Sequence, residues 1–246
     1  MNTVPILTYH SIDDSGSPIS VAPSVFRAQM AALHDAGWRT LTPRELVAGH
    51  AAGAWPDRSV VITFDDGFAN FATAALPVLV DHRFTATLFV VAGHVGGTND
   101  WKGQPAWAPR LPLLDWTALR DLPRDVVTLG AHSWSHRRLA SAATIDLQHE
   151  IVDCKREIED RTGAAVDWFA YPYGETTSAA ETLVARHFAA GVGTRLGFAT
   201  PRNNVANMDR IDVCYLRRPG WFGRMDADWL RGYLAIRRLG RKINAR

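Results

Sequence analysis

The sequence has few cysteines, no long hydrophobic run and almost no net charge. Cys154 and Cys214 are the only two cysteines in 246 residues, too few for a disulfide framework. No stretch reaches 18 consecutive apolar residues, so the sequence predicts no membrane-spanning helix. The formal charge of +2 lacks the strong positive field typical of nucleic-acid-binding proteins, and no internal repeat indicates a solenoid.

The length and the hydrophobic content are those of a folded globular protein. A hydrophobic content of 47% in 246 residues suits one large globular domain. The first residues, MNTVPILTYHS, lead from a short polar stretch directly into a strand-like segment, without the basic and apolar regions of an export signal. We therefore expect a cytoplasmic protein.

Strand-like and helix-like segments alternate along the chain. Val4–Tyr9, Ser59–Phe64, Thr85–Val91 and Val126–Leu129 have the β-branched or continuous apolar character of buried strands, and helical patterns follow them. This order predicts parallel βα units, and seven or eight of them in about 200–250 residues favour a closed barrel over an open sheet. We predict an α/β fold in a single domain, with the barrel over residues 1–220.

Two segments do not belong to this alternation. Residues 95–113 form a long loop with three prolines and two tryptophans, and loops of this length are usually functional or mobile. Residues 221–246 carry seven Arg and Lys against two Asp and have apolar residues at helical spacing. Two interpretations remain open for this segment: a last barrel helix with a basic, solvated outer face, or an interfacial helix that contacts an anionic membrane.

Chemically versatile residues follow several predicted strands directly. Because the carboxyl ends of parallel strands meet at one rim, these residues are expected to lie together. They are His10, Asp65, Asp66, the run from His132 to His136, and the run Tyr171-Pro172-Tyr173.

Within this set, His132 and His136 predict a metal site. A spacing of four residues on one helical turn would place both imidazoles on one face, and a carboxylate from another strand would complete a two-His-one-carboxylate set. Adjacent carboxylates diverge, so one of Asp65 and Asp66 could bind the ion while the other accepts a proton from the bound water.

Three motifs in this order carry a resemblance to a known family. With TFDDG (Thr63–Gly67), HSWSH (His132–His136) and YPYG (Tyr171–Gly174), the chain resembles the polysaccharide deacetylases, the NodB-homology carbohydrate esterases. The resemblance implies a distorted (β/α) barrel of about seven parallel strands and a divalent metal, zinc above all, with cobalt or nickel tolerated. It also implies removal of acetyl groups from glycans.

Carried over by motif, the resemblance gives roles to individual residues. Asp65 would be the catalytic base, and Asp66, His132 and His136 would bind the metal. The backbone N–H of Tyr173 would help to hold the oxyanion, and His10 would line the pocket.

Two family features are missing from the motifs. Ala170 stands where an Arg that orients the base is common, and Arg210 is a candidate to replace that charge. No His follows Gly191, so the usual general acid is absent, and His10, a water or Asp65 itself remain open as proton donors.

The resulting functional prediction is a metal-dependent hydrolase that removes an N-acetyl group from an amino-sugar glycan or glycan precursor, possible precursors including lipid-linked sugars. The alternatives are an O-acetyl esterase and a catalytically silent glycan-binding barrel. No nucleic-acid partner is expected. If the protein contacts a membrane at its surface, we expect the basic C-terminal helix to make that contact. Trp101, Trp134, Tyr171 and Pro172 are the predicted substrate contacts.

Overall fold

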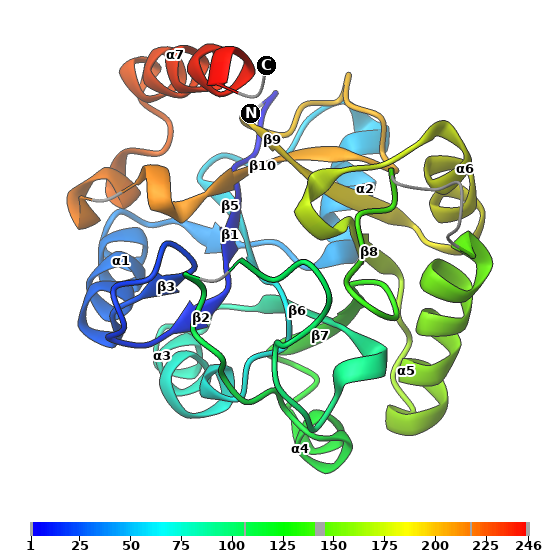
Figure 1. Cartoon of the computed structure of the whole chain (residues 1–246). Coiled ribbons are helices and arrows are strands. Elements are labelled where there is room, and N and C mark those ends of the chain that lie inside the picture. The colour runs from blue at the N-terminus through cyan, green and yellow to red at the C-terminus, as the bar shows by residue number, and fades with distance from the viewer. Residues whose placement is uncertain (1, 106, 141–145, 217, 245–246) are drawn as a thin grey trace.

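Seven parallel strands close into a barrel (Figure 1), in a computed structural model that describes residues 2–105, 107–140, 146–216 and 218–244, with only the backbone for 241–244. The strands follow the order β1-β10-β9-β8-β7-β6-β5, and β5 pairs back with β1. They are β1 (Ile6–Tyr9), β5 (Ser59–Phe64), β6 (Ala86–Val90), β7 (Val127–Ala131), β8 (Trp168–Ala170), β9 (Ala190–Leu196) and β10 (Met208–Asp212). The predicted α/β barrel is confirmed.

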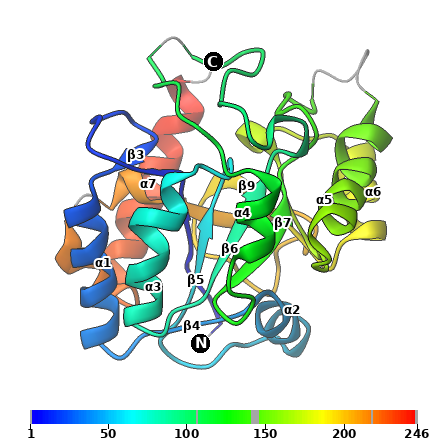
Figure 2. The same cartoon turned by 90° about the horizontal axis from the view of Figure 1, so that it is seen from below.

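Three short strands lie outside the closed ring. Strand β4 (Arg39–Thr40) extends the sheet beyond β5, and β2 (Ser11–Ile12) pairs with β3 (Ser20–Val21). Helices cover the outside of the barrel (Figures 1 and 2). They are α1 (Pro23–Asp35), α2 (Pro43–Ala52), α3 (Leu76–Asp81), α4 (Trp116–Asp121), α5 (Cys154–Thr162), α6 (Ser178–His187) and α7 (Asp228–Asn244).

Local sequence signals fix several helix boundaries. Thr42 caps α2 in a capping box: its side chain accepts from the backbone N–H of Glu45, whose carboxylate accepts from the backbone N–H of Thr42 at 2.8 Å. Pro77 interrupts the helical pattern that follows β5, because it lacks a backbone N–H. A π-helical turn, Phe71–Ala75, comes first, and α3 then starts with Pro77 in its first turn.

The barrel interior is built from alternate residues of the strands. Ile6, Val61, Phe89 and Trp168 belong to one buried cluster, whereas their strand neighbours Leu7, Val60 and Ile62 pack in the larger cluster beneath the helices. Successive side chains of a strand point to opposite faces. Continuing the same alternation toward the carboxyl ends turns Thr8, Thr63 and Asp65 inward, so the pattern that builds the core also builds the floor of the site.

Close packing of this interior yields a stability prediction at Gly130. A Cβ there would lie 2.4 Å and 2.6 Å from ring carbons of Phe89 and 3.2 Å from the carbonyl oxygen of Trp168. Gly130→Ala is therefore expected to lower stability by about 1–3 kcal/mol through overpacking, seen as a lower Tm in thermal unfolding. Gly220→Ala, where a Cβ would meet nothing within 4 Å, is the matched control and should leave Tm unchanged.

The C-terminal helix α7 lies on the outside of the molecule (Figure 1). Its buried side is formed by Leu230 and Leu234, while Trp229, Ile236 and Leu239 are exposed. Arg237 is exposed as well, so the outer side of α7 carries both apolar and basic side chains, and both interpretations of this segment stay open. Among the described residues, none of the helices combines the length and the hydropathy that a membrane-spanning helix needs.

Candidate active site

Three ligand-type atoms converge just beyond the carboxyl ends of β5 and β7. Asp66 Oδ1 lies 3.4 Å from Nε2 of His132 and 3.2 Å from Nε2 of His136. One ligand atom from each residue can be chosen so that all lie within 4.8 Å of one another, and all three residues are buried. The sequence prediction that these residues come together holds.

The hydrogen bonds around this cluster leave it suited to a metal ion. Nδ1 of His132 lies 2.8 Å from the carbonyl oxygen of Ala170, an acceptor, so Nδ1 carries the proton and Nε2 keeps its lone pair. Asp66 Oδ1 is buried without a hydrogen-bond donor among the described residues. Two imidazoles and one carboxylate form a set that binds divalent transition metals, so these residues fit such an ion.

The segment from His132 to His136 is not a helical turn, and that prediction is wrong. The chain is irregular from His132 onward, and Ser133 (φ 63°) and His136 (φ 54°) are left-handed. The Ser133 hydroxyl accepts from the backbone N–H of His136 at 2.9 Å, and Ser135 N–H donates to Glu150 Oε2 at 2.9 Å. Side-chain hydrogen bonds, rather than helical periodicity, hold the two imidazoles on the same ion site.

Backbone strain is concentrated at this rim. Besides Ser133 and His136, Asp66 (φ 74°) and Tyr173 (φ 59°) have left-handed backbones without being glycine. Such residues cost about 1–3 kcal/mol each and persist only where the surrounding structure enforces them. Four such residues around one cluster indicate that the surrounding structure holds the backbone of the site in conformations that these residues would not adopt alone.

Asp65 faces a different partner from Asp66. The Arg210 guanidinium, from β10, donates to both carboxylate oxygens of Asp65, with Nη1–Oδ1 at 2.7 Å and Nη2–Oδ2 at 2.8 Å. Nε of Arg210 donates to the carbonyl oxygen of Gly193 at 2.7 Å, and the residue is only 1% exposed. Arg210 thus supplies the positive charge beside Asp65 that Ala170 cannot, and the sequence had offered it as the candidate.

The charges around the site set its protonation. Burial alone would raise the pKa of Asp65, but the positive charge of Arg210, with the nearby His132 imidazole, brings it below its ordinary value. Burial would also raise the pKa of Asp66, yet His136 and His132 lower it strongly. Burial lowers the pKa of His136, whereas Asp65 and Asp66 raise that of His132 against its own burial. Both carboxyl groups are therefore ionised at neutral pH.

A cavity of about 440 Å³ opens onto these residues. One wall comes from the long loop, through Gln104, Pro105, Trp107 and Ala108. His10 and Tyr173 also line it, and His10 Nε2 lies 4.0 Å from Asp65 Oδ2. The long loop predicted from the sequence therefore forms part of this cavity.

The structure corrects the predicted substrate contacts. Tyr171 is fully buried, meets the Phe169 ring edge to face and donates its hydroxyl to the carbonyl oxygen of Ala206 at 2.8 Å, so it belongs to the core. Pro172 is buried and does not line the cavity. Trp134 packs against His149 instead, with ring centroids 4.4 Å apart.

Trp101 also lies behind the site rather than in the cavity. It is 3% exposed, and its ring centroid lies 4.1 Å from that of His136. It therefore fixes the orientation of a candidate metal ligand, and the loop tryptophan that lines the cavity is Trp107, 57% exposed.

Sequence reasoning missed Arg138 and the pair it forms. The Arg138 guanidinium lies 4.1 Å above the Tyr173 ring and forms an ion pair with Glu175. This arrangement ties the HSWSH loop to the YPYG turn at the edge of the cavity. The only sequence signal was its position, two residues after His136.

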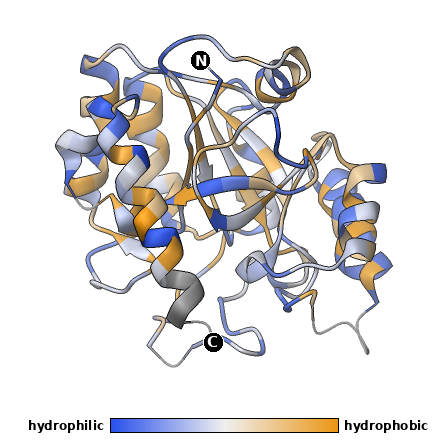
Figure 3. Ribbon diagram, turned by 90° about the horizontal axis from the view of Figure 1, so that it is seen from above, coloured by the Kyte–Doolittle hydropathy of each residue, from blue (hydrophilic) through white to orange (hydrophobic). Residues whose placement is uncertain are grey.

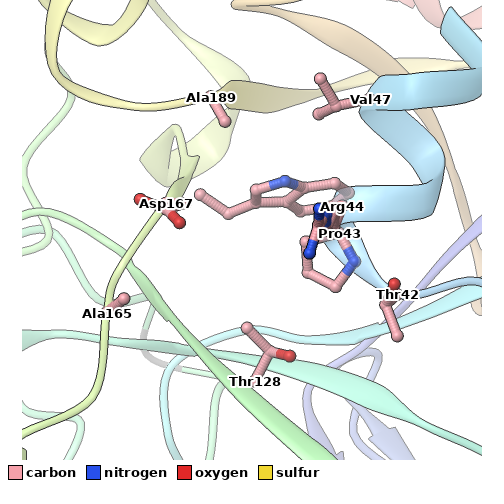
Figure 4. A pocket seen from close by; sticks show the side chains of 9 residues that line it. Thr42, Pro43, Arg44, Val47, Thr128, Ala165, Asp167 and Ala189 are labelled. Carbon is pink, nitrogen blue, oxygen red and sulfur yellow. The ribbon is translucent and has the colours of Figure 1, made fainter.

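Another cavity, of about 360 Å³, lies at the amino-terminal ends of the strands (Figure 4). Its lining includes Thr42, Arg44, Thr128 and Asp167, with no histidine or cysteine among its described residues. Catalytic groups of such barrels gather at the carboxyl ends of the strands. We therefore assign the site to the cavity that contains Asp65 and Asp66.

Removing one ligand should separate metal binding from folding. His136→Ala is expected to lower bound zinc from one ion per chain to below one tenth, because two remaining ligands cannot hold the ion. Elemental analysis after dialysis against zinc measures this occupancy, and zinc should raise Tm in the wild type but not in the variant. His82→Ala, a histidine at the end of α3 that contacts His34, should retain the ion. Full zinc occupancy in His136→Ala would contradict the assignment of His136 as a ligand.

Comparison with known proteins agrees with this geometry. A family model described as polysaccharide deacetylase matches residues 52–190. The match extends from α2 past β8, so it contains Asp65, Asp66, His132, His136 and the YPYG turn. The chain belongs to the polysaccharide deacetylase family.

Pairwise comparison with individual relatives gives low sequence identities. The chain is 28% identical over 215 residues to "Putative polysaccharide deacetylase YxkH" of Bacillus subtilis, covering 85% of this chain and 71% of that protein. It is 28% identical over 146 residues to the poly-β-1,6-N-acetyl-D-glucosamine N-deacetylase of Escherichia coli K12, covering 56% of this chain but only 22% of that protein. The Staphylococcus aureus N315 protein of the same name is 26% identical over 201 residues, covering 78% and 67%.

Solved structures show the same fold. The Streptococcus pyogenes deacetylase PplD, solved with acetate, superposes with a TM-score of 0.74 at 24% identity, covering 85% of this chain and 92% of PplD. IcaB from Ammonifex degensii superposes with a TM-score of 0.73 at 21% identity, covering 91% and 98%. At these identities the likeness concerns the barrel.

Proposed function

We propose that this protein removes an N-acetyl group from an amino sugar of a glycan or glycan precursor. The observation that carries the proposal is the side-by-side placement of an ion-binding cluster, Asp66, His132 and His136, and a second carboxylate, Asp65, that is held by Arg210. A purely binding site has no need for a base beside the ion. Both groups open into the same cavity.

The residues of the chain divide the chemistry between them. A divalent ion, for which we propose zinc, would lower the pKa of water and polarise the acetyl carbonyl. Asp65, kept ionised by Arg210, accepts the proton of the attacking water. His10, 4.0 Å from Asp65 Oδ2, is the cavity histidine outside the ligand set and donates a proton to the leaving amine. The backbone N–H of Tyr173 stabilises the charge that develops on the acetyl oxygen.

The substrate class follows from the relatives and from the cavity wall. Relatives from Escherichia coli and Staphylococcus aureus are named for poly-β-1,6-N-acetyl-D-glucosamine, and we propose a related N-acetylated glycan here. Trp107 and Tyr173 offer aromatic faces of the kind that stack on sugar rings. The cytoplasmic location and the division into residues 1–220 and 221–246 stay predictions.

Acetate release tests the proposal. The chain, loaded with zinc or cobalt, is incubated with oligomers of β-1,6- and β-1,4-linked N-acetylglucosamine and with an O-acetylated xylan, and acetate and free amine are measured. Chelator-sensitive acetate with an equal amount of amine supports the proposal. Acetate from the xylan alone would identify an O-acetyl esterase instead. Binding of a glycan without release of acetate from any substrate would favour the third hypothesis, a catalytically silent glycan-binding barrel.

A further inference from the structure

Helix α7 is fixed to the barrel by one side only. Leu230 and Leu234 are buried, and the Tyr233 hydroxyl donates to the carbonyl oxygen of Tyr215 at 3.2 Å. The ring of Trp221 lies 5.2 Å from that of Tyr233 and 5.1 Å from that of Trp229. These contacts define which face of α7 points outward.

The outward face is apolar. Trp229, Ile236 and Leu239 are 43%, 70% and 62% exposed, and they account for three of the five exposed large hydrophobic side chains in the described part of the chain. At about 100° per residue the three lie within roughly 80° of one another, opposite Leu230 and Leu234. Figure 3 looks onto α7 from outside and shows hydrophobic residues along it. A helix with one exposed apolar stripe is unusual unless something covers the stripe.

Positive charge borders this stripe. Arg231 and Arg237 lie roughly 120° to either side of it on the helix, and Arg238 pairs with Asp209 on the inner side at 3.8 Å. Arg237 lies over the Tyr215 ring at 5.3 Å, and Arg231 over the Phe198 ring at 4.8 Å. Such stacking holds each guanidinium against the body of the protein, on the flanks of α7 between the apolar stripe and the buried side. Asp228, the first residue of α7, lies 4.0 Å from Nε of Arg231, and from Trp229 to Gly240 the sequence has no further Asp or Glu.

We propose that α7 is an interfacial helix that binds the protein to a bilayer containing anionic lipids. Trp229, Ile236 and Leu239 enter the boundary between headgroups and acyl chains, and the bordering arginines meet lipid phosphates. A second copy of the chain fits less well, because a two-fold contact would bring arginines of both copies together, and Asp228, the one acid of α7, already lies 4.0 Å from Arg231. Three side chains also offer far less area than the roughly 800 Å² per partner of a stable interface.

The position of α7 connects this surface to the cavity. Figure 2 shows the C-terminal end of α7 at the same end of the molecule as the long loop. That loop carries Trp107, which lines the cavity mouth and is 57% exposed. A bilayer bound along α7 therefore lies beside the end of the barrel where the cavity opens. This arrangement suits a glycan that is itself attached to a lipid.

Co-sedimentation of the full-length chain with vesicles tests the proposal. Vesicles of phosphatidylcholine with 30% phosphatidylglycerol should sediment the chain at low salt, and vesicles of phosphatidylcholine alone should bind it at least tenfold more weakly. Ile236→Ser combined with Leu239→Ser should weaken binding to the anionic vesicles at least tenfold. Arg237→Gln should weaken it about fivefold, as one lost cation beside an anionic surface implies.

The controls keep folding and self-association apart from lipid binding. Val80→Ser removes another large exposed side chain, 49% exposed on α3, and should not change vesicle binding. All variants should keep the wild-type Tm. Failure of the wild type to sediment with anionic vesicles would overturn the proposal, as would equal binding by the double serine variant. A concentration-dependent dimer in sedimentation velocity that the same variant abolishes would assign the stripe to a second copy.

Discussion

Asp65→Asn is expected to lower kcat by about 10²–10⁴-fold, the usual contribution of a general base, while one metal ion per chain stays bound. The amide has nearly the shape of the carboxylate but cannot accept a proton from water. Asp65 contributes no atom to the cluster of Asp66, His132 and His136, so the ion site stays complete. Acetate release and elemental analysis on the same sample measure both effects.

The neighbouring carboxylate is the matched control for this variant. Asp66→Asn should lose the ion and the activity together, because Asp66 Oδ1 is the ligand atom nearest both imidazoles. Equal loss of metal in Asp65→Asn and Asp66→Asn would contradict the division of roles between the two residues. Full activity in Asp65→Asn would contradict the role of Asp65 as the base.

The sequence was sufficient for those features that depend on local pattern. Strands such as Ser59–Phe64 are continuous apolar runs, and parallel strands send their carboxyl ends to one rim, so the strand pattern alone predicts that Asp65, Asp66 and His132 lie together. The motif resemblance added the division of roles. The capping box at Thr42 and the helix break at Pro77 are likewise local, because the residues that cause each of them lie within four positions of one another.

Features that depend on residues far apart in the sequence could not be predicted, or could be predicted only in part. The bidentate contact between Arg210 and Asp65 joins residues 145 apart, so the sequence could offer the charge but not the geometry. Tyr171 directly follows a strand, as the residues at the rim do, yet the alternation of side chains along the strand turns its ring into the core. The spacing of His132 and His136 matched a helical turn, but hydrogen bonds from Ser133 and Ser135 produce an irregular loop instead.

The pair between Arg210 and Asp65 leads to the largest expected effect on stability. Arg210→Met would leave the Asp65 carboxylate buried, 3% exposed, without its counterion. Removing one partner of a buried ion pair costs about 3–5 kcal/mol, which for a chain of this size lowers Tm by about 10 °C. Thermal unfolding of the metal-loaded chain measures the change.

A double variant shows whether the cost comes from the stranded charge. Arg210→Met combined with Asp65→Asn removes both charges, so it should recover a large part of the Tm lost in Arg210→Met alone. Arg156→Met breaks an exposed pair with Asp153, in which the two side chains are 65% and 40% exposed, and should cost at most about 1 kcal/mol. If the double variant were no more stable than Arg210→Met, the loss would come from the packing of the long side chain. In that case Arg210 would support the barrel wall, and its charge would not be what holds the base.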